Sequence, residues 1–262
     1  MKMATGGTAR TYRSRVKLRI FCRCLLGLAL LVTASATVRA NEIRRSRIAL
    51  PVQHGRVTAE LFEETSPKRR PVIVVLHGAG GTLLDGPEMR RVAQYLAEAG
   101  NAVYVVHYFD RTGTLFARDS TMQKNFGLWL ETVQDSLAAI QTMRNDRTKI
   151  GIYGYSLGAF LALQVASDNQ RVAAVVEHAG GVWNSESERL RELPAVLMVH
   201  GEQDRRVPFD KYADPLVPIL RKRAARVETL FFAAQGHVFA PAAMKEVREA
   251  AVQFFWRQLA RD

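Results

Sequence analysis

The chain has 262 residues, enough for one large domain or two small ones, and its 37 basic and 25 acidic residues give a formal net charge of +12. Eight of the basic residues and none of the acidic ones lie within residues 1–40, so the remaining chain carries 29 basic against 25 acidic residues, about +4. Because a nucleic-acid-binding face needs clustered Lys and Arg, and no long basic run remains beyond residues 44–47, the charge pattern indicates no nucleic-acid partner.

Residues 1–40 have the three parts of a secretory signal peptide: a basic start, an apolar core at 24–32, and small residues that offer a cleavage site near the end. The apolar run is shorter than the about 20 residues of a membrane span, so an uncleaved membrane anchor is the alternative, and only then would the protein contact a membrane. Cys22 and Cys24 both lie in this segment. We therefore expect an exported protein, periplasmic or secreted, whose domain is residues 41–262.

From residue 46 onward, short runs typical of strands alternate with longer helical patterns. We expect strands in a leading hairpin at 48–52 and 56–62, then at 72–76, 102–107, 149–153, 172–176, 195–199 and 227–232. We expect helices at 87–99, 125–145, 159–166, 209–223 and 241–260. This alternation, with several strands apolar throughout, predicts a mostly parallel central sheet with helices on both faces. No linker divides this part of the chain, so the expected fold class is α/β with a single domain.

The stretch Gly154-Tyr155-Ser156-Leu157-Gly158 stands between a predicted strand and a predicted helix. It has the pattern G-x-S-x-G, which places the serine on a sharp strand-to-helix turn. There the next backbone N–H and the positive end of the helix face the same space. Because so short a pattern recurs by chance, the other loops decide whether it carries chemistry.

Acyl transfer by a serine requires a base, a carboxylate that orients the base, and N–H donors for the oxyanion. In an open α/β sheet such groups come from loops at the carboxyl ends of the strands. The loop after the strand at 195–199 holds Asp204, with Glu202 and Asp210 as rival carboxylates, and the loop after the last strand holds His237. The candidate groups therefore occur in the chain order Ser, Asp, His.

From about residue 46 to its end, the chain resembles the α/β-hydrolase superfamily, and within it a serine-nucleophile variant of the dienelactone hydrolase-like family. The motifs that carry the resemblance are H-G-A-G-G at 77–81, G-Y-S-L-G at 154–158, H-G-E-Q-D-R-R-V-P at 200–208 and G-H-V-F at 236–239. The resemblance implies an α/β-hydrolase fold in which Ser156 is the nucleophile, His237 the general base and then acid, and Asp204 the orienting carboxylate. It also implies that the backbone N–H groups of Ala79 and Leu157 form the oxyanion hole.

Two departures from the family pattern concern the substrate. Dienelactone hydrolases usually have cysteine as the nucleophile, and a serine in its place needs help from the base, which favours ordinary ester chemistry. They also hold a substrate carboxylate with two arginines. Arg111 resembles the first of these, whereas Pro241 occupies the position of the second. Arg111 is therefore a candidate substrate contact, and Trp183, in the loop after the strand at 172–176, is another.

Four histidines, His77, His107, His178 and His200, stand at the predicted carboxyl ends of strands, where a metal site is conceivable. His77 and His200 would be three strand spacings of about 4.8 Å apart. Since Zn–N bonds are about 2.0–2.1 Å long, one ion could not bind both. We expect these histidines to be structural, and we expect no metal and no organic cofactor.

Taken together, the residues and the resemblance predict a serine hydrolase that cleaves a small-molecule carboxylic ester or lactone through an acyl-serine intermediate. One alternative is a peptidase of the same fold, because the triad does not distinguish an amide from an ester. The other is a non-catalytic binding module that keeps the hydrolase scaffold. Fold and triad specify the chemistry, whereas the loops set substrate specificity.

Overall fold

The structure is a computed structural model that describes residues 42–66, 69–144, 149–167, 169–183, 187 and 190–259. The predicted signal peptide at 1–40, with Cys22 and Cys24, lies outside the described residues. None of the helices in the described ranges is both long enough and apolar enough to cross a membrane.

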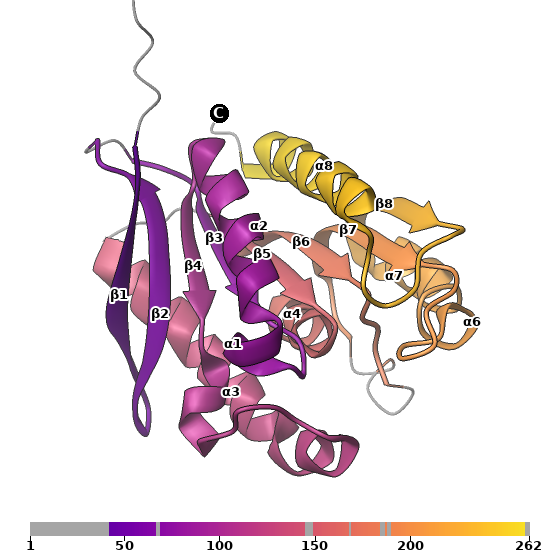
Figure 1. Cartoon of the computed structure of the whole chain (residues 1–262), viewed down its shortest axis with the longest axis horizontal. Coiled ribbons are helices and arrows are strands. Elements are labelled where there is room, and N and C mark those ends of the chain that lie inside the picture. Colours follow the sequence, from indigo (N-terminus) through magenta and orange to yellow (C-terminus); the bar gives the residue numbers. More distant parts are fainter. Residues whose placement is uncertain are drawn as a thin grey trace, which may run out of the picture. The chain divides into compact units, whose positions relative to one another are not determined.

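One eight-stranded sheet forms the centre of the described fold, with the strand order β1-β2-β4-β3-β5-β6-β7-β8 (Figure 1). The strands are β1 (Ile43–Val52), β2 (Gly55–Glu64), β3 (Val72–Leu76), β4 (Ala102–Val106), β5 (Ile150–Tyr155), β6 (Val172–His178), β7 (Leu193–Gly201) and β8 (Ala224–Phe232). The pairs from β4 through β8 are all parallel, whereas β2 pairs antiparallel with both β1 and β4. Every residue of β3 and β4 is buried, as expected for parallel strands covered on both faces. The prediction of a mostly parallel sheet is confirmed.

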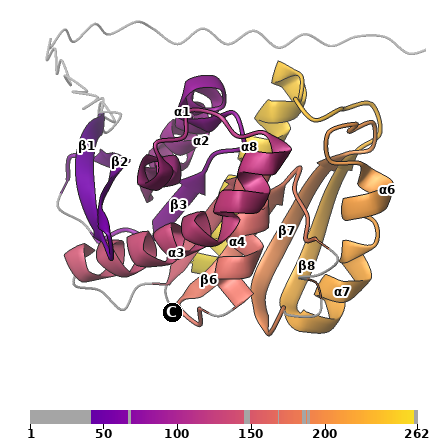
Figure 2. The same cartoon turned by 90° about the horizontal axis from the view of Figure 1, so that it is seen from below.

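Helices cover both faces of this sheet (Figures 1 and 2). They are α1 (Gly81–Leu84), α2 (Gly86–Glu98), the 3-10 helix η1 (Tyr108–Thr112), α3 (Asp119–Arg144), α4 (Leu157–Ser167), α6 (Phe209–Tyr212), α7 (Leu216–Arg223) and α8 (Pro241–Leu259). Apolar side chains of α2 and α8 form one core layer with the sheet, and those of α3, α4 and α7 form the other. The sheet is therefore shielded from water on both sides, as the sequence predicts.

Two predicted helices differ from the structure. The single helix predicted at 209–223 is broken into α6 and α7, because Pro215 has no N–H to donate and disfavours the helical conformation of Asp214 before it. The helix predicted at 125–145 begins earlier, at Asp119, where a carboxylate faces the positive helix end. The added turns are polar, so they carry no apolar periodicity that would reveal them.

This topology brings the predicted site loops to one edge of the sheet. Strands β3, β5, β7 and β8 run parallel, so their carboxyl ends all lie at the same edge. The loop at 77–81, Ser156, the loop at 200–208 and the loop at 233–240 directly follow these four strands. Residues far apart in the sequence therefore meet at one end of the sheet.

Candidate active site

Ser156 lies on the sharp turn between β5 and α4. Its φ is +53°, a left-handed conformation that residues other than glycine seldom adopt. Its backbone N–H donates to the His178 carbonyl of the neighbouring strand at 2.8 Å, which holds the turn in place. The strained conformation projects the serine side chain above the sheet, as the G-x-S-x-G pattern predicts.

The two glycines of this motif are required by close backbone contacts. A Cβ on Gly154 would lie 2.4 Å from the Gly158 carbonyl oxygen, and a Cβ on Gly158 would lie 2.5 Å from the Leu76 carbonyl oxygen. Neither backbone atom can move without shifting a strand or a helix. The glycines therefore let α4 begin directly against β3, and this fixes the height of Ser156 above the sheet.

Three side chains from three loops form a continuous hydrogen-bonded chain at this edge. His237 Nε2 lies 3.0 Å from Ser156 Oγ, and His237 Nδ1 lies 2.7 Å from Asp204 Oδ2. Both distances are within normal hydrogen-bonding range. The structure thus brings together all three residues of the predicted triad, in the order nucleophile, base, acid.

Asp204 is held as a buried carboxylate. Its other oxygen, Oδ1, accepts hydrogen bonds from the backbone N–H groups of Arg206 at 2.8 Å and Val207 at 2.9 Å. Burial acts to raise the pKa of Asp204, but the hydrogen bonds from His237 and from these N–H groups outweigh it and lower the pKa below its usual range. The rival carboxylates Glu202 and Asp210 are both exposed. Asp204 is therefore the carboxylate that meets His237.

The remaining strand-end histidines have partners of their own. His77 Nδ1 lies 2.8 Å from the Gly78 oxygen, and His107 Nε2 lies 3.0 Å from Glu60 Oε1. Strands β5 and β6 separate His77 from His200, as expected. Among the described residues, no group of three or more His, Cys, Asp or Glu side chains is arranged so that it could hold a metal ion.

The loop at 77–81 is organised by Asp85, a residue that sequence reasoning missed. The Asp85 carboxylate accepts a hydrogen bond from the Gly80 N–H at 2.9 Å and lies against the backbone of Gly78. Asp85 occupies the N-cap position of α2, yet its side chain makes no bond to that helix. The sequence signal, an Asp before Gly-Pro, indicates only a helix cap. The bond to Gly80 and the contact with Gly78 lie on either side of Ala79, whose N–H is the predicted oxyanion donor, and so fix its direction.

Replacing Asp85 by alanine is expected to lower kcat about 10- to 100-fold with little change in KM, because losing an oxyanion donor outright costs about 10²–10³ in rate and here the donor is only misaligned. Asp85→Asn, whose amide oxygen still accepts one N–H, should retain more activity than Asp85→Ala. Steady-state kinetics and thermal melting of both variants test this. If both variants lost kcat and also melted at a much lower temperature, and asparagine restored neither, Asp85 would have a structural role alone.

A pocket of about 320 Å³ opens beside Ser156. Its wall contains both predicted oxyanion residues, Ala79 and Leu157. Leu157 is the first residue of α4, and the first N–H groups of a helix have no partner within it. The predicted substrate contact Trp183 also lines this pocket and stacks on Phe160 with a centroid separation of 4.9 Å.

The second predicted substrate contact does not reach this pocket. Arg111 is absent from the described residues that line it, and its Nη2 lies 3.8 Å from Glu131 Oε2 of α3. Arg206 lines the pocket instead and donates to Asp119 Oδ1 at 3.0 Å across the rim. The cation at this pocket therefore comes from the loop that carries Asp204, because η1 turns Arg111 toward α3.

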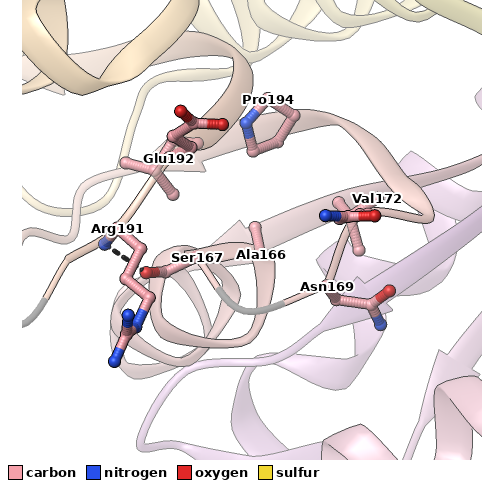
Figure 3. A pocket seen from close by; sticks show the side chains of 9 residues that line it. Ala166, Ser167, Asn169, Val172, Arg191, Glu192 and Pro194 are labelled. Carbon is pink, nitrogen blue, oxygen red and sulfur yellow. Dashed lines mark hydrogen bonds between the residues drawn. The ribbon is translucent and has the colours of Figure 1, made fainter.

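A wider hollow of about 580 Å³ lies elsewhere, where α4 ends and β6 and β7 begin (Figure 3). The amino ends of the parallel strands lie there, opposite to Ser156. Ser167 Oγ, in its wall, accepts a hydrogen bond from the Arg191 backbone N–H at 2.7 Å. This hollow is thus not part of the triad site.

Behind the serine turn, Glu177 is fully buried. Its Oε1 accepts the Gly180 N–H at 2.7 Å, and its Oε2 has no hydrogen-bond partner in the described part of the chain. Burial raises the pKa of Glu177 from 4.5 to about 8, and the Gly180 hydrogen bond opposes this rise. The folded protein therefore keeps a proton on Glu177 between these two pH values, whereas the unfolded chain releases it.

Stability should consequently fall as pH rises from about 4.5 to about 8, because the folded state binds more protons there. Glu177→Gln removes this titration, so the Tm of the variant should exceed that of the wild type at pH 9. We expect a gain of about 10 °C or more, because the raised pKa corresponds to about 5 kcal/mol at pH 9 and each kcal/mol shifts Tm by about 2–4 °C in a domain of this size. Thermal melting at pH 5, 7 and 9 tests this, with the exposed Glu202→Gln as the control. A difference from wild type that stays constant with pH would contradict the prediction.

The sheet order, the serine turn and the hydrogen-bonded triad define an α/β-hydrolase. The dienelactone hydrolase family model matches residues 57–261, so the chain belongs to the dienelactone hydrolase family. A comparison with curated protein sequences finds no match.

Solved structures of several hydrolases share this fold. A dienelactone hydrolase from Anabaena variabilis is 17% identical, with 83% of this chain and 99% of that chain covered and a TM-score of 0.62. An esterase from Pyrococcus furiosus is 13% identical, with 83% and 94% covered and a TM-score of 0.67. An acylaminoacyl peptidase from Pyrococcus horikoshii is 15% identical, with 84% of this chain but 42% of that chain covered and a TM-score of 0.66. The family and these neighbours support a hydrolase.

Proposed function

We propose that this protein is a serine hydrolase that cleaves a carboxylic ester or lactone through an acyl-serine intermediate. The observation that carries the proposal is the hydrogen-bonded chain from Ser156 through His237 to Asp204. A serine, an imidazole and a carboxylate in this order are the groups that acyl transfer by serine requires.

In the first half of the reaction, Ser156 Oγ attacks the ester carbonyl carbon while His237 Nε2 takes the serine proton. The carbonyl oxygen becomes an oxyanion, which accepts hydrogen bonds from the backbone N–H groups of Ala79 and Leu157. The tetrahedral intermediate then collapses. The bond from carbon to the leaving oxygen breaks, and His237 donates its proton to that oxygen, which gives the free alcohol and the acyl-serine.

In the second half, water replaces the alcohol. The water oxygen attacks the acyl carbon while His237 accepts a proton from the water. His237 then gives that proton to Ser156 Oγ as the bond between the acyl carbon and Oγ breaks. Asp204 keeps the Nδ1 proton of the imidazole directed toward itself, so that Nε2 faces the serine in its basic form. The carboxylic acid is released and the serine is restored.

The pocket beside Ser156 is the proposed acyl site. It contains the two oxyanion residues, Ala79 and Leu157, so the carbonyl group of a bound ester must lie at its edge. Its volume of about 320 Å³ suits a small acyl group, and Trp183 and Phe160 supply apolar contact.

The second candidate is a peptidase of the same fold, because an acyl-serine forms from an amide as well as from an ester. The similarity to an acylaminoacyl peptidase favours keeping this candidate, although the chain spans less than half of that protein. The ester proposal is preferred because this chain matches the dienelactone hydrolase family over residues 57–261.

The test is to treat the full chain with a fluorophosphonate probe, map the labelled residue, and assay p-nitrophenyl acetate and butyrate beside an acyl-amino-acid p-nitroanilide. Labelling at Ser156 with ester turnover is the expected result. Labelling at Ser156 with turnover of the anilide alone would replace the esterase by the peptidase. No labelling and no turnover would overturn both enzymes and favour a non-catalytic binding module.

A further inference from the structure

A second pocket, of about 280 Å³, lies on the other side of the triad, between the start of α2 and the loop that carries His237. We call it the α2 pocket. It lies on the face covered by α2 and α8, whereas the proposed acyl pocket lies toward α3 and α4. Its wall is mainly apolar and includes Leu84, Met89, Val238, Phe239 and Met244.

The wall of the α2 pocket comes close to the reacting serine at Gly78. A Cβ on Gly78 would lie 2.7 Å from Asp85 Oδ2, 3.0 Å from Ser156 Cβ and 3.2 Å from Tyr155 Cδ1. Asp85 and Tyr155 both line the α2 pocket. No side chain would fit at Gly78, so the wall residues Asp85 and Tyr155 pack close to the serine side chain across this glycine.

The α2 pocket also borders the loop that carries the proposed acid, His237. Tyr155 stands between the pocket and His237: its ring centroid lies 5.4 Å from that of the imidazole, and its hydroxyl donates to the His237 carbonyl at 3.1 Å. The two residues that follow His237 in the chain, Val238 and Phe239, form part of the pocket wall. One side of the pocket is thus the loop that positions the base.

The proposed function assigns the two sides of the triad different occupants. The acyl carbonyl must lie at the N–H groups of Ala79 and Leu157, which line the pocket on the α3 and α4 side. The leaving oxygen must take its proton from His237, so the rest of the leaving group extends past the imidazole. We propose that the α2 pocket is the alcohol site of this enzyme, and this proposal rests on the proposed function.

The chemistry of the wall specifies an apolar alcohol of moderate size. Leu84 and Val238 are 67% and 81% exposed at the mouth, while Met89, Phe239 and Met244 are buried behind them. The charges at the rim compensate one another, because Arg91 Nη1 lies 2.8 Å from Glu88 Oε2. An alkyl or aryl group gains free energy by leaving water for such a wall.

His178 is a buried polar side chain in this wall, in addition to Asp85 and the hydroxyl-bearing Tyr155. It is 1% exposed, and burial lowers its pKa to about 3, so the imidazole is neutral. Its Nδ1 lies 2.7 Å from the hydroxyl of Tyr153, whose raised pKa keeps the phenol protonated and able to donate. Its Nε2 has no hydrogen-bond partner in the described part of the chain. With Nδ1 as acceptor, Nε2 carries the proton, an unsatisfied donor beside an apolar pocket.

An alcohol site has a consequence for the acyl-enzyme. An alcohol bound there lies where water otherwise attacks, so it can take the acyl group instead. The alcohol oxygen bonds to the acyl carbon, the bond from carbon to Ser156 Oγ breaks, and the alcohol proton passes through His237 to Ser156. The products are a new ester and the free enzyme, and no other reactant is consumed.

The experiment measures this partition. The full-length enzyme hydrolyses p-nitrophenyl acetate in the presence of 1-hexanol or methanol, and gas chromatography determines hexyl acetate, methyl acetate and acetate. Leu84→Asp places a carboxylate at the mouth of the α2 pocket. Leu115→Asp is the matched control, because Leu115 is 70% exposed and lines neither pocket in the described part of the chain.

We expect Leu84→Asp to lower the ratio of hexyl to methyl acetate about tenfold, the scale of discrimination that an apolar pocket achieves. Leu115→Asp should leave that ratio within about twofold of the wild type. An unchanged ratio in Leu84→Asp would overturn the proposal. The proposal would also be overturned if Leu84→Asp changed the preference of the enzyme between p-nitrophenyl octanoate and p-nitrophenyl acetate, because the α2 pocket would then hold the acyl chain. Absence of any hydrolysis by the wild type would instead refute the proposed function itself.

Discussion

Replacing Ser156 by alanine is expected to lower kcat for p-nitrophenyl acetate by about 10⁵–10⁶-fold, the scale found when a serine hydrolase loses its nucleophile. Alanine cannot form the acyl bond, and the oxyanion N–H groups that remain catalyse only slow attack by water. Steady-state kinetics of the purified variant, together with loss of fluorophosphonate labelling, measure the effect. Ser156 has a φ of +53°, and alanine does not relieve this strain, so Tm should change little.

Ser46→Ala is a suitable control, because Ser46 lies on β1, at the edge of the sheet far from β5. Its kcat should stay within about twofold of the wild type. If Ser156→Ala kept more than about a hundredth of the wild-type rate, the acyl-serine would not be the intermediate, because no oxyanion hole alone supplies that much.

The second large effect is expected from Asp204→Asn, which should lower kcat by about 10⁴-fold with the fold intact. Asparagine can keep its oxygen on the N–H groups of Arg206 and Val207, where Asp204 Oδ1 now accepts two bonds. Its amide NH₂ then faces His237 Nδ1, which must become an acceptor. The imidazole proton moves to Nε2, and the base can no longer accept the proton of Ser156.

The neighbouring carboxylates provide the controls for this variant. Glu202→Gln and Asp210→Asn change exposed side chains in the same region, and both should retain kcat within about twofold. If Asp210→Asn lowered kcat as much as Asp204→Asn, Asp204 would not be the only carboxylate on which the base depends. If Asp204→Asn lowered Tm strongly as well as kcat, a disrupted loop would explain the lost activity instead of a changed tautomer.

Much of the fold could be read from local patterns. A run such as Val72–Leu76 is apolar throughout because both faces of the strand are covered, and the structure has a strand with these bounds. The break in the helix predicted at 209–223 was missed, although Pro215 is visible in the sequence. The apolar residues on either side of it keep helical spacing and so conceal the interruption.

The candidate site divides in the same way. Ser156, Asp204 and His237 were found from the sequence because each follows a strand whose carboxyl end must lie at one edge of the sheet. The left-handed turn and its glycines are local as well. Backbone connectivity alone therefore determined which loops meet and which side chains those loops contribute.

Only the tertiary structure decided where the other side chains point. Arg111 and Arg206 both belong to loops at the site, yet η1 directs Arg111 to Glu131, while Arg206 lines the proposed acyl pocket. The sequence around Asp85 indicates a helix cap, but its carboxylate accepts a hydrogen bond from Gly80 in the proposed oxyanion loop. The sequence by itself determined the fold class and the candidate triad, because periodicity and strand ends are local properties. The pockets and the partners of charged side chains depend on contacts between residues far apart in the chain, which only the packed structure specifies.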